Sequence, residues 1–188
     1  MITWVTPTRR ALRWRPLLCA PLWLLVVGAL LWSGDVADVR APVWCGLGVL
    51  AATALLAFDD PAYALLAAMP TSVRRRHGRR VVLVGTCLAV VWCAIAVVGG
   101  RVFDTWPASA AICLAALFTT GLAAMVICER RRPDVAATVG AVVPVVWAVG
   151  SQAIPVSGIV RPITELWLEH PWPVVVTASA LAFVAADR

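Results

Sequence analysis

The chain has 188 residues, of which 62% are hydrophobic and only 14% are charged, against about 45–50% and about 25% in an ordinary soluble domain. Its formal net charge is +6, and all sixteen of its basic residues are arginines. This composition excludes an ordinary water-soluble domain, and the absence of lysine excludes a phosphate-binding P-loop and Schiff-base chemistry on this chain.

Six apolar segments follow one another along the chain. We expect membrane-spanning helices over residues 17–33, 42–58, 81–99, 106–128, 135–150 and 173–187. A hydrocarbon core of about 30 Å takes about 20 residues of helix, and about 17 are tolerated. The sequence therefore predicts an all-α integral membrane protein, with six transmembrane helices in a single domain over residues 1–188.

The arginines are distributed unevenly between the two sides of these segments. Thirteen of the sixteen lie before the first segment, between the second and third, between the fourth and fifth, or after the sixth. The opposite connections carry only Arg40, Arg101 and Arg161. Because basic residues stay on the cytoplasmic side, we expect a multi-pass protein of the bacterial plasma membrane with both termini in the cytoplasm. Nucleic-acid binding is not expected, because the arginines cluster at the edges of apolar segments.

The N-terminal stretch TPTRRALRWR mixes apolar residues with arginines. Thr6 can cap a helix with Pro7 at its first position, so a short interfacial helix is expected before the first span. The basic start also allows the first segment to be interpreted as a cleaved signal peptide, but no A-x-A site follows Trp32.

The longest cytoplasmic connection, DDPAYALLAAMPTSVRRRHGRR, runs from Asp59 to Arg80. Asp60 can cap a helix that ends before Pro70, and a second short helix would carry the arginines into the third span. The first helix has no charge, so its side chains must meet lipid headgroups or another protein. The residues expected at this contact are Asp59, Asp60, Pro61, Tyr63, Leu65, Leu66, Met69 and Pro70.

The fourth and fifth segments are joined by ERRRPD, residues Glu129 to Asp134. So short a connection predicts an antiparallel hairpin with a tight cytoplasmic turn, whose arginines anchor the topology. A second cytoplasmic contact with a partner is expected at Glu129, Arg130 and Arg131.

On the outer side, residues 151–172 contain the sequence ITELWLEH. Ile163, Leu166 and Trp167 share one helical face, which predicts an interfacial or re-entrant helix between the fifth and sixth spans.

Small and weakly polar residues are frequent within the segments. Glycines that would let helices approach closely are Gly28, Gly46, Gly48, Gly85, Gly121 and Gly140. The threonines within the segments are Thr53, Thr86, Thr119, Thr120, Thr138 and Thr177, which could line a path for an amphipathic substrate or form hydrogen bonds between helices. The six cysteines, Cys19, Cys45, Cys87, Cys93, Cys113 and Cys128, show no metal-ligand spacing and are expected to be small buried thiols.

In its order of parts, the chain resembles the membrane subunit of a bacterial ATP-binding cassette (ABC) exporter of the type-2 permease class. The stretch AFDDPAYALLAAMPTSVRRRHGRR is similar to that class's connection between spans two and three, with its acidic pair, proline, P-T step and arginine cluster. The final PWPVVVTASALAFVAADR is similar to its closing span.

The resemblance implies that residues 60–69 form a coupling helix, which docks on a separate ATPase subunit. It implies a permease that pairs with itself or with a sister permease, moves an amphipathic or lipid-like substrate outward, and contacts membrane lipid. ATP and Mg²⁺ would be bound by the partner, and this chain would carry no catalytic residue, metal or cofactor.

Other classes of protein remain open on the sequence. A non-transporting accessory or immunity-type subunit would show nearly the same pattern. A rhomboid-type protease is disfavoured because Pro155 replaces the first glycine before Ser157-Gly158, and because His170 lies at the outer edge. Ion conduction is disfavoured because the expected spans carry no formal charge except Asp187, at the very end of the last one.

Overall fold

The computed structural model describes residues 40–58, 73–98, 107–153 and 171–186, together with five separate positions between residues 15 and 29. All regular structure in this described part is α-helical, and it contains no strand. The helices are α3 (Arg40–Leu56), α5 (Val73–Val98), α6 (Pro107–Glu129), α7 (Ala136–Ala153) and α9 (Pro171–Ala186). The predicted all-α class is therefore confirmed for the described residues.

The observed helices follow the five later apolar segments closely. α3, α6, α7 and α9 begin and end within three residues of the expected bounds. In the first segment, 17–33, the described residues are Leu18, Leu22, Leu25 and Ala29, and all four are helical. α9 begins at Pro171 and includes Pro173 in its first turn, where the missing proline N–H breaks no helical hydrogen bond.

The third segment differs from expectation at its start. α5 begins at Val73 and continues without a break to Val98. The arginines from Arg74 to Arg80 therefore lie on the first two turns of the same 26-residue helix, rather than on a separate short helix. No proline lies between Val73 and Val98, so the helix continues from the arginines into the apolar segment.

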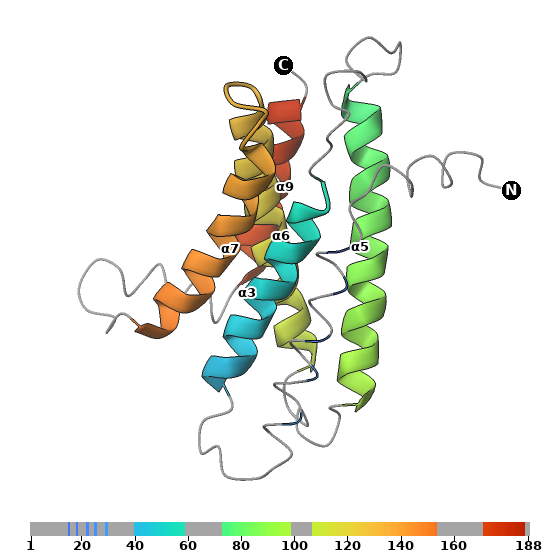
Figure 1. Cartoon of the computed structure of the whole chain (residues 1–188), viewed down its shortest axis with the longest axis vertical. Coiled ribbons are helices and arrows are strands. Elements are labelled where there is room, and N and C mark those ends of the chain that lie inside the picture. The colour runs from blue at the N-terminus through green and yellow to red at the C-terminus, as the bar shows by residue number, and fades with distance from the viewer. Residues whose placement is uncertain are drawn as a thin grey trace, which may run out of the picture.

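α6 has the most extensive packing in the described arrangement, against α7, α9 and α3. α7 also packs against α3, whereas α5 contacts α3 only slightly. Successive helices run in alternating directions (Figure 1), so the C-terminal ends of α3, α6 and α9 point the same way as the N-terminal ends of α5 and α7. The ERRRPD sequence forms the expected antiparallel hairpin between α6 and α7.

The interior of this bundle is built from small and aliphatic side chains. Leu47, Leu50, Leu55 and Leu117 are its largest fully buried leucines, and many alanines from α3, α6 and α7 fill the space between them. Ala123 of α6 forms a second cluster with Ala178 and Ala182 of α9. Alanine pairs let the two backbones approach closely, which is typical of helices that associate by packing alone.

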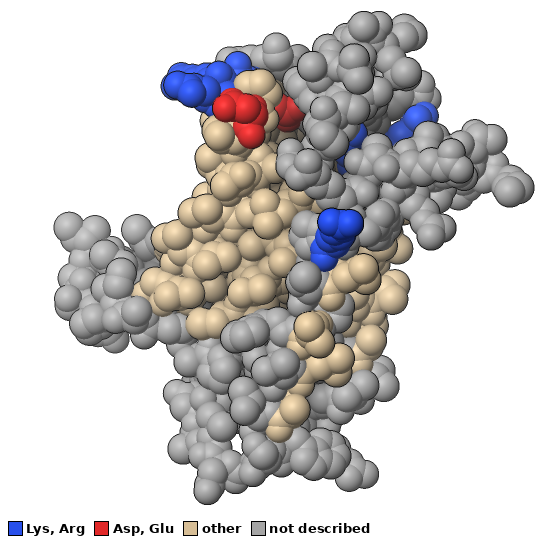
Figure 2. All heavy atoms as spheres, in the orientation of Figure 1, with Lys and Arg blue, Asp and Glu red and all other residues tan. Residues whose placement is uncertain are grey.

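The outer surfaces of the helices are also apolar. On α7 the exposed side chains are Val139, Val142, Val146 and Val149, which share one helical face. Leu18, Leu22 and Leu25 form a similar exposed row. Figure 2 shows charged atoms of described residues at the upper end and near mid-height of this face, above an uncharged surface. An apolar surface this continuous is not typical of a monomeric protein in water.

By length and composition alone, one described helix is sufficient to cross a bilayer, Ala108–Glu129. The apolar parts of three others are shorter: Trp44–Leu56, Ala136–Ser151 and Pro171–Ala185. The described residues therefore do not support six crossings by this measure. The physical reason is length, because 16 helical residues rise only about 24 Å against a core of about 30 Å.

Several expected features lie outside the described residues. They are the N-terminal interfacial helix, the coupling helix with all eight of its contact residues from Asp59 to Pro70, and the outer element between Ala153 and Pro171. Ser157 and His170 of the disfavoured protease interpretation also lie outside them.

Candidate functional site

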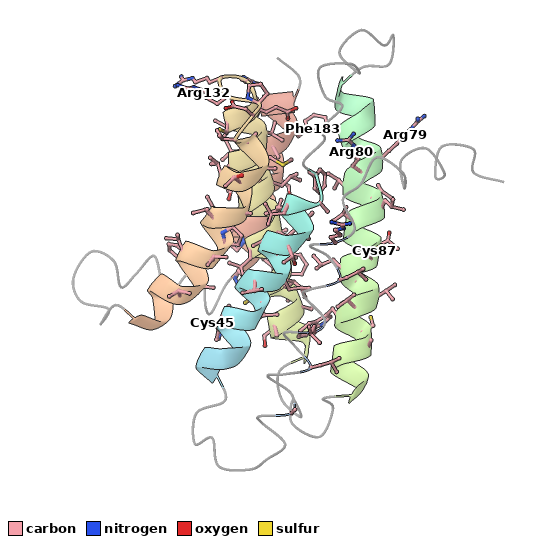
Figure 3. All side chains as sticks on the ribbon, viewed as in Figure 1. Cys45, Arg79, Arg80, Cys87, Arg132 and Phe183 are labelled. Carbon is pink, nitrogen blue, oxygen red and sulfur yellow. The ribbon has the colours of Figure 1, made fainter. Side chains whose placement is uncertain are left out.

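Charged residues gather at one end of the described bundle, which we call the arginine end. It comprises Arg79, Arg80 and the α6–α7 turn, Glu129–Asp134. Figure 3 shows Arg79, Arg80 and Arg132 toward the same end as Phe183 of α9, with Cys45 of α3 toward the opposite end. The helices thus place at one end of the bundle arginines that are about fifty residues apart in the sequence.

Arg80 is a buried cation within this end, with only 7% of its surface exposed. Its Nη1 atom donates to the carbonyl oxygen of Phe58, immediately after α3, over a long distance of 3.5 Å. The last carbonyls of a helix have no helical donor and carry partial negative charge, so a cation is favourable there. Arg80 therefore holds the start of α5 to the end of α3, on either side of the expected coupling connection.

Phe58 also anchors the end of α3 to α6. Its ring centroid lies 6.4 Å from that of Phe118, with a tilt of 47° between the ring planes. This is within the range of favourable aromatic pairs. Figure 1 shows α3 ending well short of the α6–α7 turn along the axis of the bundle.

The α6–α7 turn is fixed by backbone hydrogen bonds. The N–H groups of Arg131 and Arg132 both donate to the carbonyl of Cys128, at 2.9 and 2.8 Å. The N–H of Val135 donates to the carbonyl of Arg132 at 3.4 Å, across Pro133. These bonds satisfy the carbonyl of Cys128 at the end of α6 and hold the backbone of the turn in place.

The three arginines of the turn have different surroundings. Arg130 donates through Nη2 to the carbonyl oxygen of Ala185, near the C-terminal end of α9. All three arginine side chains are exposed, whereas Glu129 is half-buried. The structure thus gives Arg130 a contact within the chain that the sequence analysis did not expect. Both arginines expected at a second partner contact, Arg130 and Arg131, are exposed.

Three helices meet at a close contact between α3, α6 and α7, which we call the glycine junction: Gly48, Gly121, Gly140, Pro144 and Ala148. A Cβ atom on Gly121 would lie 2.6 Å from the carbonyl oxygen of Gly140, and one on Gly140 would lie 2.9 Å from that of Gly121. A Cβ on Gly48 would lie 2.6 Å from Cβ of Ala148. Any larger residue would therefore push the backbones apart, which confirms close approach at these three glycines.

Pro144 explains why the contact is so close. It is buried inside α7 and has no N–H, so the carbonyl of Gly140, four residues earlier, loses its usual helical donor. That carbonyl faces the position of a Cβ on Gly121, where the glycine has a Cα–H instead. The arrangement has the geometry of a reciprocal pair of weak Cα–H···O contacts between Gly121 and Gly140. The prediction of close approach is wrong for Gly85, whose Cβ position has no atom of the described residues within 4 Å.

The threonines within the helices satisfy their hydroxyl groups locally. Thr86 donates to the carbonyl of Val82 at 2.7 Å, and Thr120 donates to that of Ala116 at 2.7 Å. The same bonding within a helix occurs at Thr53, Thr119 and Thr177. Hydrogen bonds between helices were one expectation for these threonines. Instead, these five hydroxyls donate to carbonyls of their own helix, so they are satisfied without water.

The chemistry available in the described part is limited. It contains no group of three or more histidine, cysteine or acidic residues that could hold a metal. Of the described cysteines, Cys113 is buried and Cys93 is exposed, and the other three are half-buried, so the expectation of buried thiols is confirmed for Cys113 and wrong for Cys93.

No protein-family model, no curated protein and no solved structure matches the chain.

Proposed function

We propose that the chain is a multi-pass subunit of the bacterial plasma membrane, with the arginine end and both termini in the cytoplasm. In this proposal it is the permease subunit of an ABC exporter of the type-2 class. A separate ATPase binds ATP and Mg²⁺, and docks on the connection between α3 and α5. The observation that carries the proposal is the apolar outer surface of the helices, combined with the gathering of most described charged residues toward one end.

The exposed side chains favour lipid as the surrounding solvent. Val146 on α7 and Val176 on α9 are 62% and 63% exposed, near the middle of their helices. Apolar side chains on outward faces lose nothing in hydrocarbon, whereas in water each would leave tens of Å² uncovered. The exposed hydroxyls of Thr86 and Thr177 are already bonded within their helices, as a bilayer requires of polar groups.

Helix direction supports the assignment of sides. α3, α6 and α9 run toward the end of the bundle at which α5 and α7 begin, so successive helices must be joined alternately at its two ends. The arginine-rich connections then fall together at one end, and the positive-inside rule puts that end in the cytoplasm.

The short helices are compatible with six crossings if the bilayer adapts. α9 has 16 residues, and a short helix is accommodated by local thinning or by flanking residues at the interface, at a modest cost. α5 has an uncharged part, residues 81–98, that continues directly from its arginine-bearing turns. Its length of about 27 Å is close to that of a hydrocarbon core.

The docking proposal rests on where the connection between α3 and α5 begins and ends. Phe58 and Arg80 are in contact at the arginine end, so the connection leaves and re-enters the bundle on the proposed cytoplasmic side. Its uncharged sequence PAYALLAAM needs a covering surface. An ATPase docked there would act directly on the end of α3 and the start of α5. Its closure would shift the population between inward-open and outward-open bundles.

The described interior favours a transport path between subunits rather than through one. Among the residues whose burial is described, Arg80 is the only charged one that is buried, and the helices around the glycine junction are in direct contact. A permease of this form would therefore pair with itself or with a sister subunit, with an amphipathic or lipid-like substrate passing along the shared face.

Two substitutions in the connection test the docking proposal. Tyr63→Asp and Leu66→Asp should each abolish co-purification of the ATPase from mild detergent, because a carboxylate in an apolar contact would be buried without a partner. Membrane insertion should be unchanged. Val135→Asp, which adds the same charge to the exposed α6–α7 turn, is the matched control and should retain the ATPase. A complex that survives both connection variants would show that the connection is not the docking site.

The same close packing also favours a second candidate, a non-transporting accessory subunit. Such a subunit would bind a larger complex through the arginine end without forming a path. Purification of the native complex separates the two: an ATPase with a P-loop among the co-purifying proteins supports the permease, and its absence supports the accessory subunit.

A further inference from the structure

We infer that the α6–α7 turn carries a binding site for anionic phospholipid, formed by the guanidinium groups of Arg131 and Arg132 and by the exposed apolar residues beside them. This inference rests on the proposed membrane location of the arginine end. It assigns the outward-facing part of ERRRPD to lipid rather than to a protein partner.

The first observation is the separation of roles among three consecutive arginines. Arg130 is directed back to the carbonyl of Ala185 on α9, so its charge serves a contact within the chain. Arg131 and Arg132 are exposed, and no ion pair joins either of them to another residue that the structure describes. Asp134, two residues further on, is also exposed and forms no ion pair with either of them in the described structure. Two cations therefore remain available to an external anion.

The second observation is the rigidity of their support. Both arginines donate their backbone N–H groups to the carbonyl of Cys128, and Pro133 follows them. A guanidinium offers paired donors that match two oxygens of one phosphate group. Because the backbone is already fixed, binding a phosphate orders only side chains, which lowers the entropic cost.

The third observation is the apolar surface on either side of the turn. Ile127 on α6 is 51% exposed, and Val135 and Val139 at the start of α7 are 39% and 37% exposed. A free phosphate or an acidic protein surface would gain nothing from these side chains. A phospholipid has both parts, an anionic headgroup for the arginines and acyl chains for the apolar residues, so it fits the observed pattern best.

The test measures the affinity of the full-length chain in neutral detergent for short-chain phosphatidylglycerol and phosphatidylcholine, from the shift of its thermal midpoint as each lipid is added. Arg131→Gln and Arg132→Gln should each weaken phosphatidylglycerol binding about 5-fold and the double variant about 30-fold, taking about 1 kcal/mol per arginine and about 1.4 kcal/mol per tenfold. Phosphatidylcholine binding should not change.

Arg130→Gln is the matched control, since it removes the same charge from the same turn. It should leave phosphatidylglycerol affinity within about twofold of wild type, because Arg130 is engaged with α9. An equal loss in Arg130→Gln would mean that net charge alone attracts the lipid, which overturns a specific site. An equal shift of the thermal midpoint on adding inorganic phosphate would overturn the lipid assignment. So would Arg131 and Arg132 variants that lose a co-purifying protein but keep the wild-type affinity for lipid.

Failure of this inference is distinguishable from failure of the proposed function. A chain that stays in washed membranes but binds both lipids equally has no anionic lipid site, while its membrane location stands. A chain recovered without membranes or detergent would remove the membrane location itself.

Discussion

Gly121→Ala should destabilise the bundle by about 1–3 kcal/mol or more, the cost of overpacking a close-packed interior. The new Cβ would lie 2.6 Å from the carbonyl oxygen of Gly140, and it would also meet the side chain of Leu55. A side chain can rotate away, but the carbonyl belongs to the backbone of α7, so α6 and α7 must separate. Thermal unfolding of the full chain in detergent micelles measures the effect.

Gly85→Ala provides the control for that experiment. Gly85 lies within α5 and has no atom within 4 Å of its Cβ position, so alanine there should be neutral or stabilising by about 0.5–1 kcal/mol. Gly121→Ala combined with Gly140→Ala should cost less than the sum of the two single changes, because both force apart the same pair of backbones. Equal stability of the Gly121 and Gly85 variants would contradict the glycine junction.

Val146→Arg should prevent stable integration of the chain into membranes. Val146 is 62% exposed on the apolar face of α7. In water an exposed substitution of this kind changes stability by about 0.5 kcal/mol or less, whereas an arginine near the middle of a membrane-spanning helix costs about 2.5–3.5 kcal/mol. The amount of full-length chain that remains in alkali-washed membranes measures the difference.

Val135→Arg is the companion variant. Val135 is 39% exposed and lies at the α6–α7 turn, beside residues that are already charged. An arginine there would sit at headgroup level, so membrane yield should match that of the wild type. If Val146→Arg were tolerated as well as Val135→Arg, the exposed face of α7 would not be in contact with hydrocarbon.

The positions of the helices were largely predictable because charge marks their limits. α6 ends at Glu129, next to the first arginine of the turn, and α7 begins at Ala136, two residues after Asp134. The main difference from expectation is α5, where the short arginine-bearing helix and the span expected at 81–99 form one continuous helix. Arginine is a good helix former, so an apolar helix that follows it can extend through the cluster.

The contacts at the arginine end were not predictable. Arg80 reaches Phe58 across 22 residues, and Arg130 reaches Ala185 across 55. The sequence treats ERRR as three equivalent cations, because side-chain direction depends on how α6, α7 and α9 pack. The general attraction of arginine to helix C-terminal carbonyls is known, but it does not specify which helix end a given arginine meets.

The glycine junction was partly predictable. Gly48, Gly121 and Gly140 were expected to allow close approach, and Pro144 was visible inside an apolar segment. What links them is the four-residue spacing between Gly140 and Pro144, which frees one carbonyl at the point where α6 crosses. Gly85 has the same sequence character but lies in open space, so composition alone could not separate it from the others.

The location and orientation of the arginine end are tested most directly by labelling a single cysteine at Asp134→Cys, in a chain whose native cysteines are replaced by alanine. Asp134 is exposed in the α6–α7 turn, so a membrane-impermeant thiol reagent will reach it wherever water does. The proposed topology predicts no labelling in intact cells and full labelling after the membrane is permeabilised. Labelling in intact cells would place the arginine end outside the cell and contradict the account.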